Sequence, residues 1–109
     1  WATLVPAMTP QQNDITITKK SWGAFQATAL HEELQQRGIT QVVICGIATS
    51  IGVESTARQA YESGYNVTLA TDAMTDLNID THNNSINLIF PRLGETGSSE
   101  EIVALLPQA

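Results

Sequence analysis

The segment from Gln41 to Ala73 has the pattern of one strand–helix–strand crossover. Residues 42–45 (VVIC) form a continuous apolar run, which is typical of a strand covered on both faces of a parallel sheet. A helical pattern follows, ends at Gly64 as a glycine just past a helix does, and leads into a second apolar strand at 67–70. We therefore predict an α/β protein with a parallel sheet, a Rossmann-like fold of three αβα layers.

The helix of this crossover is predicted to bury one face. Its apolar residues recur at helical spacing, and an acidic residue stands four positions before a basic one on another face. The apolar face comprises Val53, Ala57, Ala60 and Tyr61, and the charged pair is Glu54 with Arg58.

The turn between the first strand and this helix, residues 46–52, is the predicted ligand site. Open parallel sheets bind ligands at the carboxyl ends of their strands, beside helix N-termini. The two glycines of the turn, Gly46 and Gly52, match neither a GxGxxG fingerprint nor a P-loop. A general nucleotide-binding protein is therefore the weakest of the functional readings.

Four stretches of the chain, in their order and spacing, resemble the isochorismatase-like hydrolases, which include nicotinamidases and related cysteine amidases. They are ITKKSWGAF at 17–25, GITQVVICGIATSIGVESTARQAYESGYNV at 38–67, ATDAM at 70–74 and IFPRLGE at 89–95. The resemblance covers nearly all of the chain. It implies the same α/β fold and a hydrolase that acts on a small molecule.

The nucleophile of the amidase branch has no counterpart here. The resemblance places that cysteine six positions after the glycine that ends the strand, where this chain has Gly52. Cys45, the only cysteine, precedes Gly46 inside the strand and is expected to be a small buried hydrophobic residue. Thioester chemistry then has no nucleophile. The chain also resembles the isochorismatases of the phenazine pathway, which have glycine here and hydrolyse a vinyl ether by acid catalysis, so Gly52 does not exclude catalysis.

Lys19 is the catalytic residue that the resemblance implies. In the family a lysine three positions before the aromatic residue, here Trp22, pairs with a catalytic aspartate from an earlier strand. Such a lysine can stabilise an oxyanion or lower the pKa of a carboxyl group. Without the resemblance Lys19 would be read as a surface lysine, and its neighbour Lys20 is the natural control.

The resemblance also implies that main-chain amides of the turn, at Ala48 and Gly52, form an oxyanion hole, with a cis peptide before Ala48. Thr49 could donate or accept a hydrogen bond from the substrate, as could Ser50 and Ser55, although Ser50 is better explained as a helix N-cap. Trp22 could wall the pocket or pack in the core, whereas Phe25 is expected in the core.

Other chemistries find little support. His31 and His82 are expected to be solvated, and nothing places either beside Ser50, so a Ser-His-Asp triad is rejected. Asp72 is expected to cap the turn before Met74. Asp76 and Asp80 are spaced too loosely for a calcium loop. We expect no metal and no cofactor.

The remaining elements are read from local patterns. Asp14–Thr18 alternates and is predicted to be a strand, a helix is predicted over Ala27–Arg37 with Gly38 as its stop, and residues 72–79 are expected to be irregular. A helix capped by Asp80 or Thr81 is predicted to run to Phe90, where Pro91 favours a stop. Ser98 and Glu101 indicate a capping box for a last short helix.

Composition excludes several classes of partner. The chain has only five basic residues, which are scattered, and a net charge of −6, so nucleic-acid binding is not expected. No apolar run approaches the length of a membrane span and no signal-peptide pattern is present. One cysteine permits no internal disulfide and suits the cytoplasm.

In the resembled family a strand that ends in the catalytic aspartate precedes this part of the sequence. We therefore expect residues 1–109 to be the C-terminal part of one isochorismatase-like domain, incomplete at its N-terminus. A missing N-terminal segment or a companion chain would supply the rest, and exposed sheet edges favour a homo-oligomer. The first functional reading is a hydrolase of a small molecule, a vinyl ether or an amide, without a cysteine nucleophile. The alternative is a catalytically inactive family member that serves as a binding or oligomerisation module.

Overall fold

The computed structural model describes residues 6–107 of the protein. A parallel sheet has the order β1 (Gln41–Ile47), β2 (Asn66–Thr75) and β3 (Gly94–Gly97). Helices α1 (Leu30–Gln36), α2 (Glu54–Glu62), α3 (Ile79–Asn84), α4 (Phe90–Leu93) and α5 (Ser99–Leu105) surround it. A 3-10 turn, η1 (Pro6–Met8), and two π-helical turns, η2 (Thr49–Val53) and η3 (Ser85–Ile89), complete the described elements.

The predicted crossover is confirmed. β1 and β2 pair in parallel, with Val42 opposite Val67, and η2 and α2 connect them. Gly64 has φ +91, so it adopts the left-handed conformation that ends a helix at a glycine. β2 then pairs in parallel with β3 through α3, η3 and α4, which gives the α/β class predicted from the sequence.

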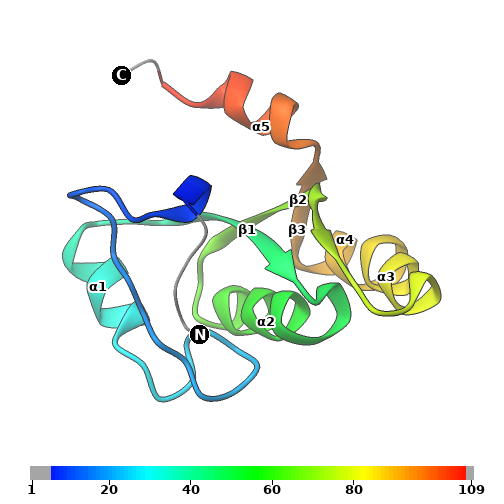
Figure 1. Ribbon diagram of the computed structural model, residues 1–109, viewed down its shortest axis with the longest axis horizontal. Helices are drawn as coiled ribbons and strands as arrows, with labels where there is room; N and C mark the ends of the chain where they lie inside the picture. Colours follow the sequence, from blue (N-terminus) through cyan, green and yellow to red (C-terminus); the bar gives the residue numbers. More distant parts are fainter. Residues whose placement is uncertain (1–5, 108–109) are drawn as a thin grey trace.

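The core lies between α2, α4 and the sheet; in Figure 1 α2 is drawn below the strands, α3 and α4 to their right and α5 above them. Central strand β2 supplies Leu69, which is completely buried, and α4 supplies Phe90, which is also completely buried. The other members are Val53, Ala57, Ala60, Tyr65, Val67 and Met74. Three of the four apolar residues predicted for the buried face of α2 are therefore in the core, whereas Tyr61 is 53% exposed.

The prediction that β1 is covered on both faces is wrong. Its residues alternate between exposed and half-buried, because β1 is an edge strand whose second face no described element covers. Val43 is 49% exposed and Ile47 is 74% exposed. Cys45 lies on the same face and is exposed, so the expectation of a buried thiol is also wrong.

Several element boundaries differ from the predictions before β1. Asp14–Thr18 forms no strand, since it pairs with none of the three strands of the sheet. Helix α1 begins at Leu30 and not at Ala27, because Ala27 has φ +52 and cannot be helical. Gly38, with φ +67, follows the end of α1 as predicted.

Boundaries after β1 differ as well. β2 continues to Thr75 through part of the segment predicted to be irregular, and Asn78 caps α3 in place of Asp80 or Thr81. The chain remains helical past Pro91, because proline is tolerated in the first turn of α4, where its missing N–H has no intrahelical partner.

Strand β3 was not predicted, because GETG has no strand pattern. The first residue of β3 has to be glycine, because a Cβ on Gly94 would overlap the carbonyl oxygen of Val67 in β2. The capping box of Ser98 and Glu101 at the start of α5 is confirmed.

Candidate active site

The turn after β1 is built by main-chain geometry. Gly46 has φ +127, the Ile47–Ala48 peptide is cis, and Ala48 is extended with φ −98 and ψ 148. The Ala48 carbonyl accepts hydrogen bonds of 3.1 Å from the amides of Ile51 and Val53, which closes the turn into η2. The turn therefore lies at the carboxyl end of β1 and at the start of helical structure, as predicted.

The Lys19 ammonium reaches this turn. Its Nζ donates to the carbonyl oxygens of Trp22 at 2.8 Å and Ser21 at 3.4 Å. A Cβ built on Gly52 would lie 3.3 Å from Lys19 Nζ, 3.4 Å from the Trp22 carbonyl oxygen and 3.6 Å from the Ile47 carbonyl oxygen. The structure thus brings Lys19 and the nearby Trp22 main chain together with Gly52, which is far from both in the sequence.

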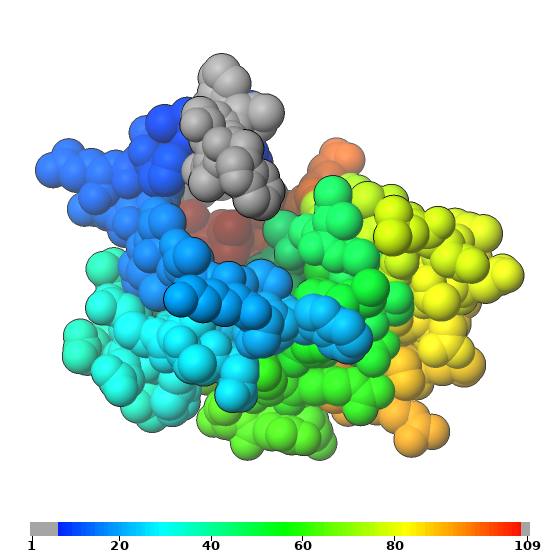
Figure 2. All heavy atoms as spheres, turned by 60° about the horizontal axis from the view of Figure 1, so that its bottom comes forward, coloured from blue at the N-terminus to red at the C-terminus, as the bar shows by residue number. Residues whose placement is uncertain are grey.

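Two side chains of α2 hold the segment that carries Lys19. The Ala24 amide donates to Thr56 Oγ1 at 2.9 Å, and the Phe25 amide donates to Gln59 Oε1 at 3.1 Å. Gly23 is buried against Gln59, because a Cβ on Gly23 would overlap the side-chain amide of Gln59. Figure 2 shows the blue segment that precedes α1 lying against the green surface of the crossover. Sequence reasoning missed Thr56 and Gln59; their common helix face was the signal that could have found them.

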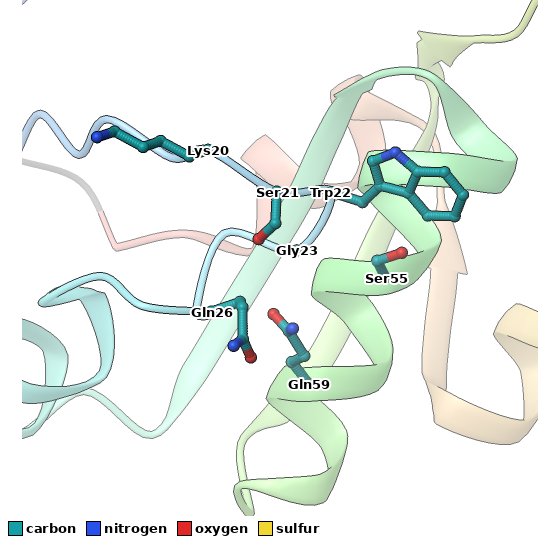
Figure 3. A pocket seen from close by; sticks show the side chains of 7 residues that line it. All are labelled: Lys20, Ser21, Trp22, Gly23, Gln26, Ser55 and Gln59. Atoms are coloured by element: carbon teal, nitrogen blue, oxygen red, sulfur yellow. The ribbon is translucent and has the colours of Figure 1, made fainter.

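A cavity of about 440 Å³ lies between this segment and α2 (Figure 3). It is lined by Lys20, Ser21, Trp22, Gly23, Gln26, Ser55 and Gln59. In Figure 3 Gln26 and Gln59 face each other, Trp22 lies near Ser55, and Lys20 extends away from the rest. Trp22 is 66% exposed, so it is no core residue. The cavity adjoins the turn through Trp22 but is lined by neither Lys19, Ala48, Thr49 nor Gly52.

The predicted packing of Phe25 is confirmed. Its ring packs against the core at a centroid distance of 5.7 Å from Tyr65, and it lies 6.5 Å from the ring of His31. The expectation that His31 is solvated is wrong, because its Nδ1 is hydrogen-bonded to the Tyr65 hydroxyl at 2.8 Å. This contact joins α1 to the start of β2.

Hydrogen bonds from the chain after β2 hold the other side of the turn. Thr49 is completely buried and its Oγ1 lies 2.7 Å from Nδ1 of half-buried His82, so the expectation of a solvated His82 is wrong. The Ser50 amide and hydroxyl both donate to Asp76 Oδ2, at 2.7 and 2.5 Å. These bonds, the hydroxyl above all, lower the pKa of Asp76 to about 2.

The capping roles expected for Ser50 and Asp72 are both wrong. Ser50 lies inside η2 and does not cap it; Ala48 stands at the N-cap position. Asp72 does not cap the turn before Met74, because it accepts hydrogen bonds from the Ser99 amide at 2.7 Å and hydroxyl at 2.8 Å. These bonds lower the pKa of Asp72 and attach β2 to the start of α5.

Within residues 6–107, no three His, Cys, Asp or Glu side chains gather as a metal ion would require. The absence of a metal from the complete protein stays a prediction. None of the helices described in this range has the length and apolar character needed to cross a membrane.

The fold and the turn define an α/β protein with its candidate site at the carboxyl end of a parallel strand. The chain belongs to the isochorismatase family: the family model described as Isochorismatase domain matches residues 1–101. This confirms the resemblance read from the sequence motifs.

Individual relatives agree. The isochorismatase family protein YwoC of Bacillus subtilis is 47% identical over 103 residues, which are 94% of this chain and 54% of that protein. The structure of an isochorismatase family protein from Burkholderia thailandensis has a TM-score of 0.91 at 44% identity, covering 95% of this chain and 55% of that one. Nicotinamidase 3 of Arabidopsis thaliana is 35% identical over 78 residues, 71% of this chain and 39% of that protein. The chain spans about half the length of the relatives that it matches most fully.

Proposed function

We propose that this chain forms part of a hydrolase of the isochorismatase family that acts on a small molecule, an amide or a vinyl ether, without a cysteine nucleophile. The observation that carries the proposal is the position of the Lys19 ammonium, 3.3 Å from where a Gly52 side chain would begin. A cation held at the carboxyl end of β1, above a turn of main-chain amides, favours negative charge at that point.

The catalytic roles follow from this placement. In amide hydrolysis, a carboxylate takes a proton from water as the water adds to the carbonyl carbon, and the resulting oxyanion is stabilised by the Lys19 ammonium and by the amides of Ala48 and Gly52. The carboxyl group then donates the proton to the amide nitrogen, the C–N bond breaks, and a carboxylic acid and ammonia or an amine leave. Gly52 offers no side chain that could attack, so water is the nucleophile. In the hydrolysis of a vinyl ether, a carboxyl group protonates the carbon–carbon double bond, water adds to the resulting oxocarbenium ion and returns a proton to the carboxylate, and the hemiketal breaks its C–O bond to release an alcohol and a carbonyl compound. Lys19 then stabilises the carboxylate that is left once the proton has been transferred.

The carboxyl group that this proposal requires is not assigned to residues 6–107. In residues 6–107 Lys19 forms no ion pair with an acidic side chain. We propose that the aspartate comes from an N-terminal segment or from a companion chain, and that residues 1–109 are the C-terminal part of the domain.

Binding of the substrate is assigned to two places. The Trp22 indole forms one wall of the cavity of about 440 Å³, while the Trp22 carbonyl accepts from Lys19. Trp22 therefore connects the cavity to the reacting groups. The hydroxyl of Thr49 is bound to His82, so we assign the main-chain amide of Thr49 to substrate binding.

We further propose that the protein is cytoplasmic and that it forms a homo-oligomer. The homo-oligomer is proposed because the face of β1 that carries Val43 and Ile47 is exposed and apolar.

A comparison of two neighbouring lysines tests the function. In the complete natural protein, nicotinamide, as an amide, and isochorismate, as a vinyl ether, are the first substrates to assay. Lys19→Ala is expected to lower kcat/KM by a factor of about 10²–10³, as the loss of one oxyanion donor does. Lys20→Ala should change kcat less than about threefold, because Lys20 extends away from the other labelled side chains in Figure 3; its place in the lining of the cavity would affect KM alone. A larger loss of activity in Lys20→Ala than in Lys19→Ala would show that the family's lysine has been assigned to the wrong position.

The glycine at position 52 also supports the alternative reading, an inactive family member that binds a ligand or forms oligomers. Under that reading neither substrate is turned over, and calorimetry still detects binding of one of the two. Turnover that Lys19→Ala abolishes would exclude it.

A further inference from the structure

Both carboxylate oxygens of Asp76 accept hydrogen bonds, and one of them is bound to the turn after β1. Its Oδ2 accepts from both the amide and the hydroxyl of Ser50, and its Oδ1 accepts from the Leu77 amide at 2.7 Å. Both carboxylate oxygens are therefore fixed. Hydrogen bonds to an ionised acceptor are about twice as strong as neutral ones.

The position of Ser50 gives these bonds their importance. Ser50 stands two residues after Ala48 and two before Gly52, in the middle of the turn that the Lys19 ammonium approaches at Gly52. Asp76 approaches from the end of β2, so it holds the turn across 26 residues of sequence. Lys19 approaches from the segment before α1.

Two further contacts, one in the turn and one at the start of α2, involve side chains alone, so Asp76 is the only charged side chain hydrogen-bonded to the main chain of the turn among the described residues. Thr49 is tied to His82 through side chains, and Glu54 Oε1 accepts from the buried Ser85 hydroxyl at 2.7 Å. Both fix the side chains of the η2–α2 segment. The bond from the Ser50 amide to Asp76 acts on the peptide itself.

We propose that Asp76 is a positioning residue for the reaction: through Ser50 it sets the direction of the amides at 48–52 and their separation from the Lys19 ammonium. This inference rests on the proposed function. Asp76 itself touches no reacting atom. Its effect arises because displacement of a catalytic group by about 1 Å can cost a factor of 10² in rate.

The chain contains a matched control for this role. Asp72 holds the amide and the hydroxyl of Ser99 through one oxygen, just as Asp76 holds Ser50. Ser99 begins α5, whereas Ser50 lies in the turn after β1. Asp72→Asn and Asp76→Asn therefore remove the negative charge and one acceptor oxygen from the same kind of contact at two places, only one of which is the candidate site.

The experiment combines NMR spectroscopy and kinetics on the complete natural protein. Asp76→Asn is expected to shift the amide resonances of Ser50 and Gly52 and to lower kcat about 10- to 100-fold, with a smaller change in KM. Asp76→Glu, which restores a carboxylate, should recover part of kcat. Asp72→Asn should shift the Ser99 amide and leave kcat and the Gly52 amide unchanged. If Asp76→Asn does not fold, Ser50→Ala, which removes only the hydroxyl bond, should shift the same amides to a smaller extent.

An unmoved Gly52 amide in folded Asp76→Asn would overturn the inference, and so would an equal loss of kcat in Asp72→Asn. The NMR measurement needs no substrate. If the protein hydrolyses neither nicotinamide nor isochorismate, the proposed function fails while the NMR result still decides whether Asp76 fixes the turn. If turnover is present and Asp76→Glu recovers no more rate than Asp76→Asn, the proposed function stands and the positioning role fails.

Discussion

The ammonium nitrogen of Lys19 lies 3.3 Å from the point at which a side chain on Gly52 would begin. This separation is tighter than an ordinary van der Waals contact to a Cβ, so a residue larger than glycine forces the ammonium to move. The contact links the segment before α1 to the turn after β1. It is the geometric reason for treating Gly52 and Lys19 as one site.

In the complete natural protein, Gly52→Ala should reduce the hydrolysis that we propose without unfolding the protein. The added Cβ meets the flexible end of Lys19, which can move by a few tenths of an ångström, and alanine favours helical structure over glycine by about 1 kcal/mol. We expect an unchanged or slightly higher free energy of unfolding, measured by urea denaturation, and a lower kcat/KM.

Gly38→Ala is the control for that substitution and should behave in the opposite way. No heavy atom lies within 4 Å of a Cβ there, but φ is +67, so alanine is strained by about 1–2 kcal/mol. Stability should fall and kcat/KM should not change. Equal loss of activity in both variants would contradict the role given to Gly52.

Gln59→Ala should release the segment that carries Lys19 and Trp22. The Phe25 amide loses its acceptor, and the contact of Gln59 with Gly23 is lost, so we expect a loss of about 1 kcal/mol in the free energy of unfolding and a weaker affinity for ligands. Gln26→Ala, an exposed residue that lines the same cavity, should change stability by less than about 0.5 kcal/mol. Calorimetry measures the ligand affinity of the two variants, and urea denaturation measures their free energies of unfolding. Similar losses of stability in Gln59→Ala and Gln26→Ala would contradict the role of Gln59 in holding this segment.

Phe90→Ala should be the most destabilising of these substitutions. The ring is completely buried between α2 and the sheet, so its removal leaves a cavity and should cost about 3–5 kcal/mol. Leu88, two residues earlier, is 61% exposed, and Leu88→Ala should cost less than about 1 kcal/mol. Equal losses in chemical denaturation would mean that α4 does not pack as described.

The contribution of Asp76 to stability should vanish in acid. The pKa of Asp76 falls from the ordinary 3.8 to about 2 on folding, so its stabilising effect is complete above pH 3.8 and is lost as the pH falls through about 2. Wild type should therefore be more stable than Asp76→Asn at about pH 6 and should approach it towards pH 2. Urea denaturation over that range measures the difference, and a gap that does not change with pH would argue against an ionised Asp76 in the turn.

The local patterns of the sequence predicted some elements well and others poorly. The capping box of Ser98 and Glu101 and the glycine stop at Gly64 involve contacts within one helix, so they could be read directly. Asp14–Thr18 has strand propensity but finds no partner, and β3 has a partner but no strand propensity, because strand formation depends on pairing with a distant segment.

The sequence by itself determined the crossover from β1 through α2 to β2, the family, and the candidate residues Lys19 and Gly52. Each is encoded in the order of residues within a short stretch. The tertiary structure alone decided which groups meet. Asp76 contacts Ser50 across 26 residues, His82 contacts Thr49 across 33, and Gln59 holds Phe25 across 34. Hydrogen bonds between side chains and distant partners carry no periodicity along the chain, since the packing of helices against the sheet sets their geometry.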